Sequence, residues 1–196
     1  MRAFLREILV ILIVAIVIFL LLQIVFQKAG VNGYSMEPSL QDGQQLLINK
    51  VVYYFHKPER GDVIILHPPP PYSPKELPFI KRIIALPGDT IEVKNGAVYV
   101  NGLKLDEPYI KEPPAYNLPP KKITENEYFV LGDNRNNTSD SHNGWTVPRQ
   151  NIIGKAWLSI WPLSEWGLVQ NYPLNKQLES SSASSFPSET CLSGID

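Results

Sequence analysis

Residues 90–100 read TIEVKNGAVYV, two runs of alternating apolar side chains separated by Asn95-Gly96. An Asn-Gly pair between such runs is the strongest short-range signal for a β-hairpin, because both turn positions favour positive φ angles. Ile91 and Val93 precede the turn, and Val98 and Val100 follow it. The sequence therefore predicts a tight antiparallel hairpin at this point.

Short apolar runs on both sides of this hairpin extend the β pattern. Each is rich in Ile, Val or Leu and lies near turn residues, which is typical of strands. No stretch after residue 28 keeps a helical period over three turns. We therefore expect a mainly β fold, an antiparallel barrel-like or sandwich-like body. The runs are residues 45–49, 62–66, 79–85, 128–131 and 152–161.

Two segments do not fit a packed β core. Pro68 to Pro78 is so rich in proline that we expect an extended loop. Residues 177–196 are polar and serine-rich, which predicts a disordered tail that contains Cys191. The expected body is residues 29–176, enough for one hydrophobic core with a short accessory hairpin.

The N-terminus carries a long apolar segment. Residues 8–26 read ILVILIVAIVIFLLLQIVF, in which only Gln23 is not apolar. A helix of this length is close to the thickness of the hydrocarbon core of a membrane. A cleaved secretory signal is the alternative, but residues 27–31 form a poor small-x-small cleavage site. We therefore expect residues 1–28 to be an uncleaved, single transmembrane anchor.

The charges that flank the apolar segment indicate its orientation. Arg2 and Arg6 precede the segment, and Lys28 follows it. Positive residues tend to remain in the cytoplasm, so we expect a cytoplasmic N-terminus and a body on the other side of the membrane.

Composition argues against several other classes of protein. Lys and Arg number 18 against 19 Asp and Glu, a formal net charge of -1 that does not favour nucleic-acid binding. One Cys excludes an internal disulfide, and three His make a Cys/His zinc cluster improbable. The polar loop 132–142 fails the calcium-loop pattern, because Arg135 stands at a ligand position. These features favour neither a Cys/His zinc cluster nor a calcium loop.

Ser35 is a candidate nucleophile, since it lies on a turn between Gly33 and Pro38 just beyond the expected membrane exit. The alternative is an ordinary loop serine, because turns favour serine. Lys81 is a candidate base. On a strand its face carries Phe79 and Ile83, and burial among apolar groups lowers a lysine pKa. The alternative is a surface lysine that extends its amine into water.

His142 is a second candidate base. Asp140, two residues before it, would orient the imidazole in a Ser-His-Asp arrangement. The loop 132–142, which holds both residues, is dense in hydrogen-bonding groups. This composition also suits a buried polar network that braces a catalytic group. The residues alone do not decide whether Lys81 or His142 is the base.

Three motifs follow the apolar segment in a specific order. Ser35 lies in a Ser-Met-x-Pro turn, Lys81-Arg82 precedes Leu86-Pro87-Gly88-Asp89, and Gly132-Asp133-Asn134-Arg135 precedes Asp140-Ser141. In this order and behind a span, they resemble the type I signal peptidases, membrane-anchored serine proteases that use a Ser-Lys dyad.

The resemblance covers nearly all of residues 1–162. It implies that Ser35 is the acylated nucleophile and that Lys81 is the general base. Thr138 stands where the family usually has a serine that hydrogen-bonds the lysine amine. Asp140 matches a bracing aspartate of the family.

The resemblance also implies partners. Arg82 and Asp133 would form a supporting ion pair. The substrates would be exported preproteins with small side chains at the first and third positions before the cut, bound as an added β-strand. The lipid bilayer is a further expected partner, and no metal or cofactor is implied. The expected substrate-binding residues are Gly33, Met36, Phe79 and Ile80.

The sequence departs from the family at several positions, including Asn143-Gly144-Trp145 where a Trp-Gly order is more usual, and two of the departures bear on the proposed site. His142 stands where many members carry an arginine, which leaves the charge pairing of Asp140 open. Gly33 stands where some members have an oxyanion serine, so the backbone N–H of Ser35 would need another donor beside it.

Two other functions compete with this hypothesis. The related self-cleaving repressor proteases share the Ser-Lys fold, but they need a DNA-binding domain and no membrane span. An anchored β-domain that binds exported proteins without cleaving them is the non-enzyme alternative.

Overall fold

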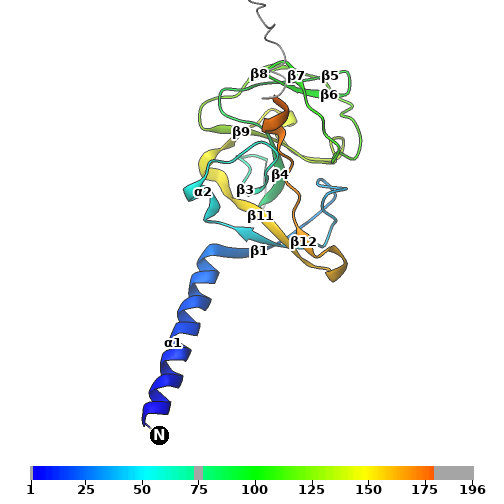
Figure 1. Cartoon of the computed structure of the whole chain (residues 1–196). Coiled ribbons are helices and arrows are strands. Elements are labelled where there is room, and N and C mark those ends of the chain that lie inside the picture. The colour runs from blue at the N-terminus through cyan, green and yellow to red at the C-terminus, as the bar shows by residue number, and fades with distance from the viewer. Residues whose placement is uncertain (1, 73–76, 179–196) are drawn as a thin grey trace, which may run out of the picture.

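The computed structural model describes residues 2–72 and 77–178. A long helix, α1 (Arg2–Val25), extends from a body built of two antiparallel sheets (Figure 1). The mainly antiparallel β fold predicted from the sequence is confirmed.

Helix α1 is long and apolar enough to cross a membrane. Its segment Phe4–Val25 has a mean hydropathy of 3.5 and buries none of its residues against the body. At about 1.5 Å per residue it is roughly 33 Å long, close to the thickness of the hydrocarbon core. The carbonyl of Val25 accepts a hydrogen bond of 3.0 Å from the Lys50 backbone N–H, which ties the end of the helix to the body.

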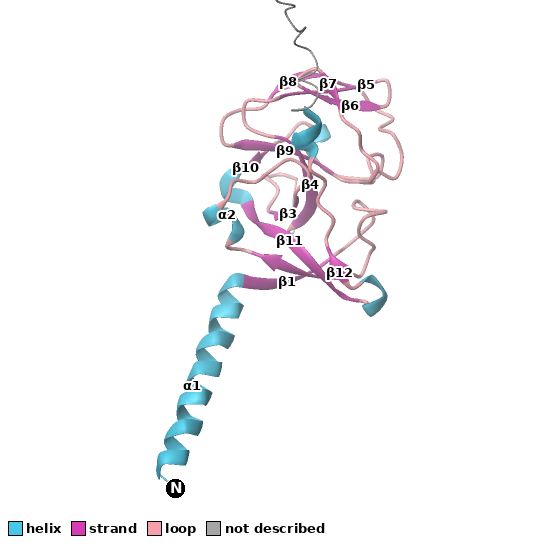
Figure 2. Ribbon diagram, in the orientation of Figure 1, coloured by secondary structure: helices cyan, strands magenta, loops and turns pink. Residues whose placement is uncertain are grey.

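The larger sheet begins directly after α1. Its strand order is β1-β2-β11-β3-β4-β9-β10, and β12 pairs with β11. Figure 2 shows that these strands make up the half of the body nearer to α1, except for β9 and β10, which lie farther from it. The strands are β1 (Phe26–Gly30), β2 (Gln45–Asn49), β3 (Val63–Leu66), β4 (Phe79–Ala85), β9 (Glu127–Leu131), β10 (Val147–Pro148), β11 (Ile152–Trp161) and β12 (Gly167–Leu168).

The smaller sheet has the order β7-β6-β5-β8 and contains the predicted hairpin. Asn95 and Gly96 adopt φ angles of 51° and 71°, and Ile91 pairs with Val100 across the strands. Its strands are β5 (Thr90–Lys94), β6 (Ala97–Val100), β7 (Leu103–Lys104) and β8 (Leu118–Lys122). The short helices of the described residues are α2 (Val52–Phe55), η1 (Ser141–Asn143), η2 (Arg149–Asn151) and η3 (Leu163–Glu165), and residues 174–178 form a further helical turn.

Several strands were missed by the sequence pattern for physical reasons. Strand β8 contains Pro119 and Pro120, which argue against a strand interior, but it lies at a sheet edge where the missing N–H groups are tolerated. Strand β1 begins at Phe26, which the hydropathy pattern had assigned to the span.

The C-terminal segment 169–178 binds the two sheets together. Asn171 Oδ1 accepts a 3.0 Å hydrogen bond from the Val63 N–H, and the side chain of Leu174 is fully buried. Gln177 exchanges hydrogen bonds of 2.8 and 2.9 Å with the backbone of Asp106. The sequence had placed Gln177 and Leu178 in the tail, and this boundary was wrong, because both residues contact the body. Of the predicted tail, residues 179–196, with Cys191, lie outside the described residues.

The predicted loop Pro68–Pro78 is described only in part, since residues 73–76 lie outside the described residues. Its described residues before Phe79 form no strand.

Gly61 offers a test of the packing of the C-terminal segment. It has a φ of 91°, and a Cβ there would overlap the carbonyl of Tyr172. Gly88 has a similar φ of 85° with nothing within 4 Å of the same position. We expect Gly88→Ala to cost about 1–2 kcal/mol of unfolding free energy from backbone strain alone. Gly61→Ala should cost about 3 kcal/mol or more, because the steric overlap adds to that strain.

The measurement is unfolding of the two full-length variants in the same detergent. Equal losses in both variants would contradict the close approach of Tyr172 to Gly61.

Candidate active site

Ser35 lies on a turn that follows β1, and the polar loop 132–142 holds this turn in place. The Ser35 carbonyl accepts a 3.0 Å hydrogen bond from the Asn134 N–H. The Asn134 side-chain amide donates to the Tyr34 carbonyl at 3.0 Å. Gly33 adopts a φ of 87° and donates its N–H to Asp42 Oδ1 at 2.7 Å. The backbone on both sides of Ser35 is therefore fixed.

Lys81 extends from β4 to the Ser35 side chain. Its Nζ donates to Ser35 Oγ at 2.7 Å and to the Ile80 carbonyl at 3.0 Å. The side chain is buried, and the Phe79 ring centroid lies 5.2 Å from Nζ. The apolar surroundings expected from the alternation of β4 are present.

Burial changes the acid–base behaviour of this amine. Loss of solvation lowers the pKa of Lys81 from 10.5 to about 8, although the negative charges of Asp140 and Asp133 oppose the shift. A neutral amine at hydrogen-bond distance from a serine hydroxyl can accept its proton.

The side chains of Ser35 and Lys81 line a groove of about 570 Å³. All four expected substrate-binding residues, Gly33, Met36, Phe79 and Ile80, line it together with Thr138. The remaining walls are Gly30, Val31, Asn32, Tyr34, Pro78, Asn136, Asn137 and Ser139.

Thr138 lies in this groove, but not with the contact that the sequence predicted. Its Oγ1 is buried and has no hydrogen-bond partner among the described residues. No hydrogen bond joins it to the Lys81 amine, which donates to the Ile80 carbonyl and to Ser35 Oγ. Gly132 packs so closely against Thr138 and the Ser35 carbonyl that a Cβ at position 132 would overlap both.

Asp140 is fully buried and braces the loop. Its carboxylate accepts from the Gly132 N–H at 2.8 Å and from the His142 N–H at 3.0 Å. His142 Nδ1 lies 2.7 Å from the same carboxylate, so His142 is the partner of Asp140 that the sequence left open. The His142 ring stacks on Tyr116 at 4.4 Å and does not line the groove. The alternative Ser-His-Asp arrangement is therefore not assembled, since the hydroxyl of Ser35 pairs with Lys81.

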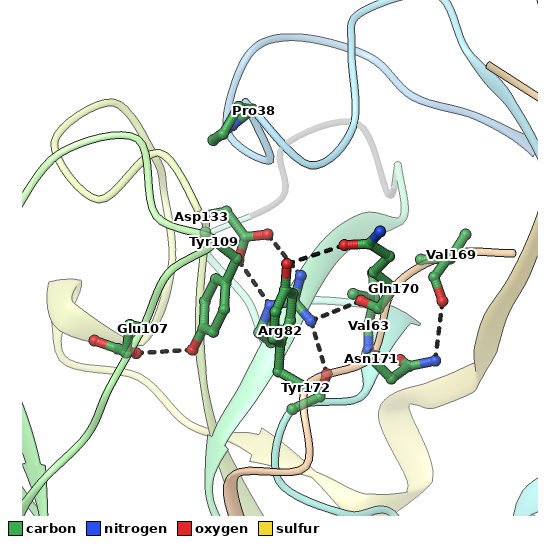
Figure 3. A network of polar contacts seen from close by, with 12 residues as sticks. Pro38, Val63, Arg82, Glu107, Tyr109, Asp133, Val169, Gln170, Asn171 and Tyr172 are labelled. Atoms are coloured by element: carbon green, nitrogen blue, oxygen red, sulfur yellow. Dashed lines mark hydrogen bonds and ion pairs between the residues drawn. The ribbon is translucent and has the colours of Figure 1, made fainter. Parts of the chain in front are cut away.

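Arg82 and Asp133 form the predicted ion pair (Figure 3). Two bonds of 2.9 and 2.7 Å join them, and both side chains are fully buried. Arg82 also donates to the carbonyls of Gly61 and Gln170, at 2.8 and 3.1 Å. Its guanidinium lies 4.3 Å from the Tyr109 ring centroid. The pair thus joins β4, the polar loop and the C-terminal segment.

Three contacts around the site were missed by the sequence reading. Asn134 clamps the serine turn, Arg135 forms a buried ion pair with Glu107 at 2.6 Å, and Lys111 pairs with Glu37 at 2.8 Å. The polar composition of the loop 132–142 was the available signal for these contacts. Nothing in the local sequence indicates that residues 107–111 reach the site. Within the described ranges, no group of three or more His, Cys, Asp or Glu residues is placed to hold a metal ion.

A serine hydroxyl beside a buried lysine amine, on an antiparallel β scaffold behind an apolar helix, is the arrangement of a Ser-Lys hydrolase. The chain matches the family model for signal peptidase, peptidase S26, over residues 4–161. It belongs to this family of serine endopeptidases.

Similar proteins come from several lineages. The chain is 45% identical over 174 residues to "Probable signal peptidase I-1" of Synechocystis sp., covering 86% of this chain and 89% of that protein. It is 37% identical over 147 residues to "Thylakoidal processing peptidase 1, chloroplastic" of Arabidopsis thaliana, covering 71% of this chain and 43% of that one. A crystal structure of a signal peptidase I from Enterococcus faecalis V583 is 29% identical, with a TM-score of 0.45 over 51% of this chain and 97% of that one.

The pKa of Lys81 predicts the pH dependence of the reaction. Below that pKa the amine is protonated and cannot accept the Ser35 proton, so kcat/KM should rise with pH and level off above about 8. The pH–rate profile of the wild type, measured with a peptide substrate, checks this. A rate that is already flat between pH 6 and pH 9, a range that brackets the expected pKa by roughly one to two units, would remove Lys81 as the base.

Proposed function

We propose that this chain is a membrane-anchored endopeptidase that cleaves signal peptides from exported preproteins, with Ser35 as nucleophile and Lys81 as general base. The observation that carries the proposal is the 2.7 Å contact between Lys81 Nζ and Ser35 Oγ at the floor of an open groove. The family and its relatives named as signal peptidases support the substrate class.

The proposed reaction has two halves. Ser35 Oγ attacks the scissile carbonyl while Lys81 takes its proton, and the resulting ammonium then protonates the departing amine as the peptide bond breaks. The backbone N–H of Ser35 stabilises the oxyanion. A water molecule, deprotonated by Lys81, then hydrolyses the acyl-enzyme and releases the signal peptide.

The edge of β4 supports binding of the substrate as an added strand. Phe79 and Ile80 pair with β3, but the pairing of β4 with β9 begins only at Arg82. The other backbone edge of residues 79–80 therefore faces the groove that they line. We propose that the small side chains before the cut seat there against Met36, Phe79 and Ile80.

Exposed apolar side chains support a membrane location for the site. In Figure 1, β1 and β12 lie at the end of the body nearest α1. Five apolar side chains of β11, η3, β12 and the residues beside them are 43–71% exposed, and tryptophan is typical of the membrane interface. They are Trp157, Trp161, Leu163, Trp166 and Leu168.

We propose the orientation that the flanking charges favour, with the N-terminus in the cytoplasm and the groove on the opposite side. Likeness to both bacterial and thylakoidal peptidases supports either a plasma or a thylakoid membrane. The match to the signal peptidase family and helix α1 favour this function over that of a self-cleaving repressor.

The direct test is incubation of the detergent-solubilised full chain with a preprotein, followed by sequencing of the new N-terminus. Ser35→Ala and Lys81→Ala should each abolish cleavage, and the double variant should be no worse, because nucleophile and base act as one unit. His142→Phe, which keeps a ring against Tyr116, should retain activity.

Loss of activity in His142→Phe together with activity in Lys81→Ala would reverse the assignment of the base. Continued cleavage by the Ser35→Ala protein would mean that a contaminating protease cuts the preprotein. The chain would then be a domain that binds exported proteins without cleaving them.

Thr138 provides a narrower test of the dyad. We propose that its unpartnered hydroxyl orients the Lys81 amine once the proton of Ser35 has moved. Thr138→Val should then lower kcat by about tenfold or more through lost positioning, while Thr138→Ser should be close to wild type. Unchanged kinetics and an unchanged pH profile in Thr138→Val would remove this residue from the site.

A further inference from the structure

A second hollow lies where α1 meets the larger sheet. This junction crevice has a volume of about 680 Å³ and lies outside the catalytic groove. Half of its lining is apolar and half is polar, which is the composition that suits an amphiphile. The apolar residues are Phe19, Leu22, Phe26 and Leu47, and the polar residues are Gln23, Gln27, Lys28 and Lys50.

The two lysines give the crevice its charge. Neither Lys28 nor Lys50 forms an ion pair within the described part of the chain, whereas Lys94, Lys111 and Lys155 are each paired with a carboxylate. No Asp or Glu lines the crevice. It therefore presents two unneutralised positive charges in a chain whose formal net charge is -1.

The position of the crevice along the chain fixes its depth. It takes in the last turns of α1, from Phe19, and the first residues of β1. Since Phe4–Val25 spans about the thickness of the hydrocarbon core, Lys28 and Lys50 lie at the level of the lipid headgroups. The Phe26 ring stacks on Trp157 at 5.0 Å, which places an aromatic pair at the same level.

We propose that the junction crevice binds one anionic phospholipid of the leaflet on the side of the body. An acyl chain lies along Phe19 and Leu22, and the phosphate is held between Lys28 and Lys50. A basic pocket next to a membrane span selects anionic headgroups. The apolar part of a substrate's signal peptide is a poorer fit, because it offers no negative charge to the two lysines.

Lipid binding at this point has a structural consequence for the groove. Strand β1 runs from Phe26, in the crevice, to Gly30, in the wall of the catalytic groove. A lipid wedged between α1 and β1 therefore fixes the angle between the anchor and the body, and with it the height of Ser35 above the bilayer.

The experiment compares lipid retention in three forms of the full chain. Wild type, Lys28→Gln/Lys50→Gln and a control, Lys104→Gln/Lys122→Gln, are reconstituted in nanodiscs that contain phosphatidylcholine and phosphatidylglycerol in equal amounts. The control removes the same charge from exposed lysines of the smaller sheet. Native mass spectrometry then counts the lipid that each released protein retains, without any substrate.

We expect wild type and control to retain one phosphatidylglycerol in preference to phosphatidylcholine. The preference should fall by about tenfold in Lys28→Gln/Lys50→Gln and return in Lys28→Arg/Lys50→Arg. Equal losses in the control, or equal retention of both lipids by wild type, would overturn the proposal. Displacement of the lipid by soluble glycerol phosphate would also overturn it, because the acyl chain would then not be bound. Since the readout is binding, its failure is distinguishable from a failure of the proposed protease.

Discussion

The buried ion pair of Arg82 and Asp133 is the contact on which the geometry of the site depends. Burial of two charges away from solvent costs free energy. Removal of one partner of such a pair typically lowers the unfolding free energy by about 3–5 kcal/mol. Here the cost is offset by two carbonyl acceptors, Gly61 and Gln170, and by an aromatic ring on the guanidinium. Because Arg82 is the neighbour of Lys81 and Asp133 is the neighbour of Asn134, which holds the serine turn, the pair fixes base and nucleophile relative to each other.

The same arrangement explains the electrostatic balance at Lys81. Burial lowers the pKa of the amine, and the charges of Asp140 and Asp133 raise it. Neither carboxylate bonds to the amine, since Asp133 is bound by Arg82 of β4 and Asp140 by Gly132 and His142 of the polar loop. The two carboxylates therefore act on Lys81 through space, and the amine keeps its contact with Ser35 Oγ.

Local patterns predicted most of the strands, because alternation and the Asn95-Gly96 turn are local properties of the chain. They failed at β8, where an edge position tolerates two prolines, and at Gln177, whose partner Asp106 is far away in sequence. The contact between Lys81 and Ser35 joins residues 46 positions apart, so only the order of motifs pointed to it. The hydrogen bond of the amine to the carbonyl of its own neighbour Ile80 depends on the direction of one side chain and has no signal in the sequence.

The path of the C-terminal segment has a consequence for the biogenesis of the protein. The groove is built from residues near 33, 80 and 138, but the arginine that organises it also needs the carbonyl of Gln170 and packs beside Tyr172. A chain that emerges from its N-terminus displays Ser35 first and the residues that close this network last. The hydroxyl and the amine therefore come into register only after Gln170 and Tyr172 have been synthesised, so a nascent chain that has not reached these residues carries no assembled protease site.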